Sequence, residues 1–181
     1  MKTARGSDLK KYVIFSLITI IFLSGCTYYK IKSKSKPTVD LNKYEKIYLG
    51  YLDLGEDRWA TYGYATEKEW LDIIRRVNKS ALPSYFREVF EEKTIVMAKK
   101  PGEAPPKDCL IINFQNANFL YSDDQLFVTI DFIDGATSRN LATYSAYIKA
   151  WRGGGWVVWS FESRVVNSIR NLAYFVKERI F

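Results

Sequence analysis

The side chains that most often carry protein chemistry are scarce in this sequence. It has no histidine, and its only two cysteines are Cys26 and Cys109. These facts exclude histidine-based acid/base catalysis, Ser-His-Asp and Cys-His nucleophile pairs and histidine-ligated metal sites. Two cysteines also cannot supply a four-cysteine zinc site or a disulfide framework. Cys109 lies at the start of a predicted strand, where we expect it to be a small buried apolar side chain. We therefore expect no catalytic residue, no metal site and no cofactor.

Carboxylates are the remaining candidates for catalysis. Asp131 and Asp134 lie close together in the sequence, so a carboxylate- or metal-dependent hydrolase is the alternative interpretation. A strand face exposed to water accounts for Asp131 without any catalytic role, and we favour that interpretation. Asp53, Glu56 and Asp57 offer oxygen atoms of the kind that bind Ca²⁺, but they lack the spacing of a calcium-binding loop. A solvated acidic loop is the favoured explanation for these three.

Aromatic side chains form the most distinctive cluster. Trp151, Arg152, Trp156 and Trp159 flank the turn Gly153-Gly154-Gly155. Tryptophan and arginine are frequent anchors of binding surfaces, which makes the cluster a candidate partner-binding platform. Because tryptophan is usually mostly buried, core filling at one end of a sheet is the competing interpretation.

The N-terminus carries a targeting pattern. Basic residues in positions 1–11 precede an apolar core, Val13–Leu23, which is about half the length needed to cross a bilayer. Two small residues and a cysteine follow in Leu23-Ser24-Gly25-Cys26, which resembles the lipobox of bacterial lipoproteins. The resemblance implies cleavage before Cys26 and acylation of its thiol, with palmitate-type chains anchoring the mature protein. More than one acyl chain is needed for a stable anchor, and this family supplies two or three.

The same resemblance implies a location and a type of partner. Thr27, which follows the cysteine, differs from the Asp that retains lipoproteins at the inner membrane of enteric bacteria. The expected location is the outer membrane, facing the periplasm. The expected partners are the lipid bilayer, through acylated Cys26, and an envelope protein or peptidoglycan. The expected function is a binding or assembly accessory module of the cell envelope, and the alternative is an envelope hydrolase.

The positive charge lies mainly outside the expected domain. The chain has a formal charge of +7, but residues 1–25 hold four basic and one acidic side chain, and residues 26–40 hold four and one. Residues 41–181 then hold 19 basic and 18 acidic groups. A nucleic-acid-binding domain carries its positive charge on its own surface, so we exclude nucleic acid as a partner.

The chain divides into three parts. Residues 1–25 form the signal peptide, residues 26–41 a lipidated basic tether, and residues 42–181 a single domain. The tether alternates lysine with small polar residues, so we expect it to bury nothing and to be disordered or extended. The fifteen residues after Cys26, Thr27 to Leu41, would span at most about 50 Å when fully extended.

Hydrophobic periodicity predicts the elements of the domain. The capping box Thr66-x-x-Glu69 begins an amphipathic helix that Pro83 would kink, and a second helix begins at Ser160 or Phe161. Strands are predicted at 44–52, 94–97, 109–121, 125–133, 141–151 and 156–159. The order is β-α-β, then a β-meander, then α. We expect an α+β fold with an antiparallel or mixed sheet covered on one face by the helices, an outline similar to small envelope accessory lipoproteins.

Overall fold

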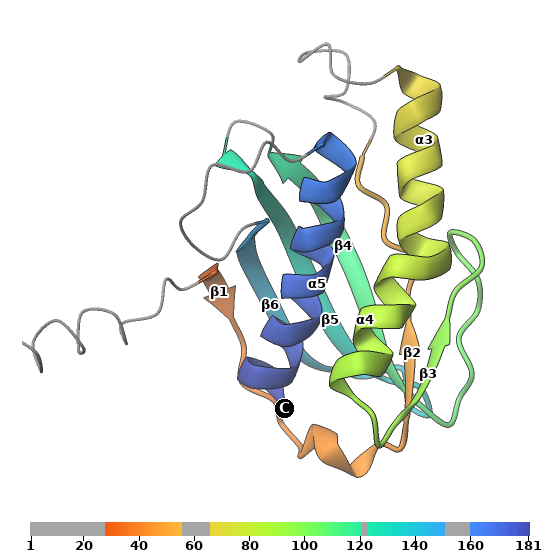
Figure 1. The fold of residues 1–181 in the computed structure, drawn as a ribbon. Coiled ribbons are helices and arrows are strands. Elements are labelled where there is room, and N and C mark those ends of the chain that lie inside the picture. Colours follow the sequence, from red (N-terminus) through yellow and green to blue (C-terminus); the bar gives the residue numbers. More distant parts are fainter. Residues whose placement is uncertain (1–27, 56–65, 121–122, 151–159) are drawn as a thin grey trace, which may run out of the picture.

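The computed structural model describes residues 28–55, 66–120, 123–150 and 160–181. A twisted sheet forms one layer, and the helices form a second layer against one of its faces (Figure 1). The expected α+β class, with a mixed sheet covered on one side, is confirmed.

The sheet has six described strands in the order β1-β6-β5-β4-β2-β3. They are β1 (Tyr29–Lys34), β2 (Lys46–Leu49), β3 (Thr94–Met97), β4 (Leu110–Leu120), β5 (Gln125–Asp134) and β6 (Asn140–Lys149). Strand β2 runs parallel to both β3 and β4, whereas β4, β5, β6 and β1 are joined by antiparallel pairs. The predicted first strand, 44–52, is therefore present but shorter, and the predicted strand at 156–159 lies outside the described residues.

The central strands alternate as their sequence predicts. Leu126, Val128, Ile130 and Phe132 of β5 are all fully buried. In β6, Ala142, Tyr144, Ala146 and Ile148 are buried, while the residues between them are partly exposed. A strand turns successive side chains to opposite faces, so one face of each strand packs beneath the helices.

The first helical segment is continuous but changes its winding. It comprises α3 (Glu67–Arg76), a π-helical turn (Val77–Ala81) and α4 (Leu82–Val89). Pro83 has no N–H, and in a regular helix its ring would collide with the carbonyl four residues earlier. The wider turn, in which the Leu82 N–H reaches the Val77 carbonyl, stands in front of the proline. The predicted kink is thus a π-helical turn.

The C-terminal helix α5 (Phe161–Ile180) lies across the sheet beside α4 (Figure 1). Its N-cap is Ser160, whose hydroxyl accepts from the Ser163 N–H. The predicted apolar stripe, Val165, Ile169, Leu172 and Val176, is fully buried in the core. Among the described residues, no helix combines the length and apolar character needed to cross a membrane.

The predicted tether is folded from Tyr28 onward. Residues 29–34 are extended, as expected, but they pair with β6, with Tyr29 opposite Ile148 and Ser33 opposite Ser145. Tyr28 and Leu41 are buried, and the Tyr28 hydroxyl donates to Glu178 on α5 at 2.8 Å. The prediction that this stretch buries nothing is therefore wrong. Lysines at an edge strand extend into solvent, so charge does not prevent pairing there.

Candidate functional site

Several predicted site residues lie outside the described parts of the chain. They are the lipidation residue Cys26, the cluster Trp151, Arg152, Trp156 and Trp159, and the loop acids Glu56 and Asp57. Asp53 is described and exposed, and its carboxylate accepts from the Gly55 N–H at 3.1 Å, which closes a small loop after β2. Within the described ranges, no group of three or more His, Cys, Asp or Glu side chains is placed to hold a metal ion.

Asp131 and Asp134 are engaged in separate local structures. Asp131 is buried, not solvent-facing as predicted, and its Oδ1 accepts from the Thr143 hydroxyl at 2.6 Å and from the Asn140 amide at 3.4 Å. Asp134 accepts from the Ala136 N–H at 2.8 Å in the turn after β5. That backbone hydrogen bond holds the pKa of the Asp134 carboxyl below its ordinary value. Each carboxylate thus stabilises the strand or turn that carries it.

Cys109 has the structural role that its sequence context predicts. It is buried in a small apolar cluster with Tyr48, Ala98 and Ile111, on the sheet face without helices. Its thiol donates to the Pro106 carbonyl at 3.1 Å, and burial raises the thiol pKa. A thiol with a raised pKa is a poor nucleophile.

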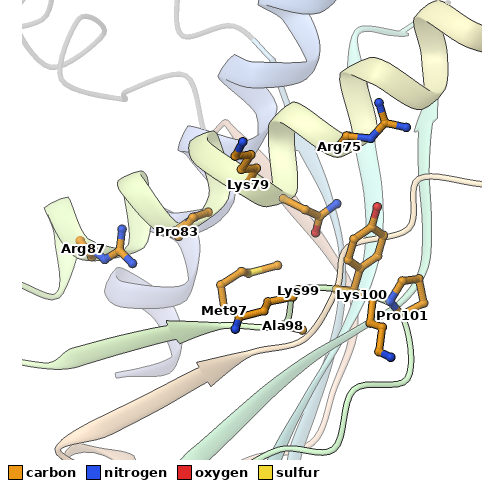
Figure 2. Close-up of a pocket in the computed structure, with 11 residues that line it drawn as sticks. Arg75, Lys79, Pro83, Arg87, Met97, Ala98, Lys99, Lys100 and Pro101 are labelled. Carbon is orange, nitrogen blue, oxygen red and sulfur yellow. The ribbon is translucent and has the colours of Figure 1, made fainter.

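A basic pocket of about 580 Å³ lies between the first helical segment and the loop after β3 (Figure 2). It is lined by Tyr51, Arg75, Asn78, Lys79, Pro83, Arg87, Met97, Ala98, Lys99, Lys100 and Pro101. Five of these eleven side chains are cationic, and none is acidic. Residues 41–181 as a whole are almost electrically balanced, with 19 basic and 18 acidic groups, so the pocket concentrates charge of one sign.

The cations reach the basic pocket from two sides. Arg75, Lys79 and Arg87 belong to the helical segment, and Lys99 and Lys100 to the loop that follows β3 (Figure 2). All five are exposed to solvent. The basic pocket therefore has positive charge on both of its walls.

Most of these cations have no acidic partner in the described chain. Arg75 pairs with Asp72 at 2.6 Å, but Lys79, Arg87, Lys99 and Lys100 form no ion pair with any described residue. Glu103, in the same loop, accepts from the Lys99 backbone N–H and lines a neighbouring pocket instead. The positive field of the basic pocket is therefore only partly compensated by the protein itself.

The wall of the basic pocket is fixed by Asn78 in the π-helical turn. Asn78 is buried, and its side-chain amide bonds the backbone of Leu52 and the carbonyl of Ile74. These bonds tie the turn to the chain that leaves β2. Single-turn π-helices inside α-helices are frequent at functional sites.

Sequence reasoning did not find the basic pocket. Its cations occur between positions 75 and 100 without a local motif, and the near-equal totals of basic and acidic residues in 41–181 conceal them. The one local signal is Lys99-Lys100 directly after a short strand. Only the parallel pairing of β2 with β3 brings that pair opposite the helix.

Comparisons with known proteins assign the chain to no family. No protein-family model and no curated protein matches it. A PelC dodecamer from Paraburkholderia phytofirmans, in space group P6, is similar in structure, with a TM-score of 0.44 and 11% identity over 82% of this chain and 95% of that one. A variant PelC dodecamer from the same organism gives a TM-score of 0.41 at 11% identity, over 83% of this chain and 98% of that one. These likenesses are too distant to assign the chain to a family or an activity.

Proposed function

We propose that the protein is a lipid-anchored binding module of the bacterial cell envelope. The observation that carries the proposal is the lipobox-like Leu23-Ser24-Gly25-Cys26 followed almost at once by folded chain. Strand β1 begins at Tyr29, and Tyr28 is already buried. Three residues reach at most about 11 Å, so a lipid on Cys26 would hold the domain against its membrane.

The proposed location is the outer membrane, facing the periplasm, because Thr27 is not the residue that retains lipoproteins at the inner membrane. The proposed partner is an envelope protein or peptidoglycan, bound without chemical conversion. Binding is favoured over hydrolysis because Asp131 and Asp134 serve local hydrogen bonds in separate places. The basic pocket and the predicted tryptophan cluster are the two candidate contact sites.

Metabolic labelling tests the anchor. Cells producing the full chain are grown with radioactive palmitate, and the protein is immunoprecipitated and fractionated with membranes. Cys26→Ala should lose both the label and the cleaved form, whereas Cys109→Ala should keep both, because Cys109 is buried in the domain. Equal labelling of wild type and Cys26→Ala would overturn the lipid anchor.

Crosslinking tests the binding role. Crosslinked membranes from cells with wild-type protein should give a specific adduct with an envelope protein or with peptidoglycan. If purified protein instead releases product from peptidoglycan or its glycan strands, and Asp131→Asn abolishes that release, the protein is a hydrolase.

A further inference from the structure

We propose that the basic pocket binds a ligand that carries two or more phosphoryl groups. The site and its ligand class go beyond the lipid anchor and do not depend on it, because the pocket is built by residues of the folded domain. The ligand source is either a phospholipid headgroup or a soluble phosphate compound, and both present phosphoryl oxygens to the pocket.

Charge balance selects a multivalent anion. A phosphoryl monoester carries about −1.5 to −2 at neutral pH, so two such groups offset roughly three to four positive charges. The pocket presents five cations, of which only Arg75 is paired with a described carboxylate. A single carboxylate would leave most of this charge uncompensated.

The types of cation also suit phosphate. The guanidinium groups of Arg75 and Arg87 offer planar forks that bind phosphate through two parallel N–H bonds. Lys79, Lys99 and Lys100 add compact ammonium charges from both walls of the pocket (Figure 2). Positive charge on both walls favours a ligand with more than one phosphoryl group.

The remaining lining accepts the uncharged part of such a ligand. Pro83, Met97, Ala98 and Pro101 give the basic pocket an apolar portion. Its volume of about 580 Å³ lies within the range of roughly 300–1,000 Å³ usual for ligand sites. A ligand with both charged phosphates and an apolar or sugar portion is therefore accommodated.

The position of the basic pocket agrees with ligand binding. It lies beyond the carboxyl ends of the parallel strands β2 and β3, the edge at which sheets of this kind usually bind ligands. Strand β1 is antiparallel to β2 through the sheet order, so its first residue, Tyr29, lies at this same end of the sheet. A lipid headgroup could thus reach the basic pocket, as could a soluble ligand.

Methionine NMR provides a direct test. The chain has two methionines, Met1 and Met97, and Met97 lines the basic pocket. The full chain, labelled with ¹³C-methyl methionine in nonionic micelles, is titrated with inorganic pyrophosphate, orthophosphate and citrate. Pyrophosphate should shift the Met97 methyl signal in a saturable way, and at lower concentration than orthophosphate or citrate.

A pair of double variants controls for net charge. Lys79→Gln with Lys99→Gln removes two pocket cations, whereas Lys68→Gln with Lys107→Gln removes two exposed cations that do not line the pocket. The first pair should weaken pyrophosphate binding by roughly tenfold or more, because charge-assisted hydrogen bonds are lost. The second pair should change the affinity by less than about twofold, as expected for remote charges screened by salt.

To distinguish a lipid headgroup from a soluble ligand, the micelles are doped with cardiolipin, which has two phosphates, or with phosphatidylcholine, which has one. A Met97 shift with cardiolipin that the pocket variant loses supports a headgroup ligand, and a shift with pyrophosphate alone supports a soluble one. The proposal is overturned by an unmoved Met97 signal, by equal binding of citrate and pyrophosphate, or by equal losses in the two double variants.

Discussion

The side-chain amide of Asn78 bonds both backbone groups of Leu52: its Oδ1 accepts from the Leu52 N–H at 2.7 Å, and its Nδ2 donates to the Leu52 carbonyl at 2.8 Å. Both residues are buried. One polar side chain thereby holds the helical wall of the basic pocket to the segment that follows β2.

Replacing this amide should destabilise the domain. Asn78→Leu removes three hydrogen bonds and leaves the buried Leu52 N–H and carbonyl without partners. Each orphaned group costs about 1–3 kcal/mol, so we expect a loss of about 3 kcal/mol in the free energy of unfolding by urea. Ser80→Ala, at an exposed position of the same turn, should change it by less than about 1 kcal/mol. Equal stability of both variants would contradict a fixing role for Asn78.

Hydrogen exchange distinguishes a paired β1 from a free tether. The Ser35 N–H donates to the Thr143 carbonyl at 2.8 Å, whereas the Lys36 N–H has no partner among the described residues. We expect the Ser35 amide to exchange at least about tenfold more slowly than that of an unstructured peptide, since exchange requires local opening. The Lys36 amide serves as the internal control and should exchange rapidly. Equally fast exchange at both positions would contradict the pairing of β1 with β6 and would support the predicted unpaired tether.

Asp131 should matter for stability through its hydrogen bonds. Asp131→Ala leaves the part-buried Thr143 hydroxyl without its acceptor, and we expect a loss of about 1–3 kcal/mol in the free energy of unfolding. Asp131→Asn keeps an acceptor oxygen and should lose less. Asp123→Ala, at an exposed position, should stay within about 0.5 kcal/mol of wild type. If Asp131→Ala is as stable as Asp123→Ala, the buried carboxylate does not serve to stabilise the sheet.

The capping box of α3 predicts a pH dependence. Glu69 accepts from the Thr66 N–H at 2.7 Å and from its hydroxyl at 3.0 Å, and the backbone bond lowers the pKa of the Glu69 carboxyl from its ordinary 4.5. A carboxyl with a lowered pKa in the folded state stabilises that state above its unfolded pKa, and the contribution disappears as the pH falls through the folded value. Wild type should therefore lose thermal stability below about pH 4.5 more steeply than Glu69→Gln does.

Glu67→Gln is the matched control for that pH series. Glu67 lies in the same first turn and is exposed, but the capping box does not involve it. Its removal should leave the acid dependence close to that of wild type. Identical profiles for Glu69→Gln and wild type would show that the capping box does not titrate with folding.

Local sequence patterns predicted the strands and helices in which one face is buried along the whole element. The alternation of Leu126, Val128, Ile130 and Phe132 predicted a half-buried strand, and the spacing in 165–176 predicted the buried stripe of α5. The Thr66–Glu69 capping box likewise forms within four residues. Such features depend on backbone periodicity and near neighbours, so the sequence alone carries them. The lipobox resemblance at Cys26 also comes from the sequence alone, and remains a prediction.

Other features were decided by contacts between distant segments. The lysine-rich stretch 29–34 is a strand because β6 offers an unpaired edge, a partner that its own residues do not specify. Asp131 is buried because Thr143 and Asn140, on the neighbouring strand, supply its hydrogen bonds. The basic pocket exists because β2 pairs in parallel with β3, which places Lys99 and Lys100 opposite the helix that connects the two strands. The charged residues follow no sequence periodicity that would predict this juxtaposition. It arises only when the helix packs on the sheet.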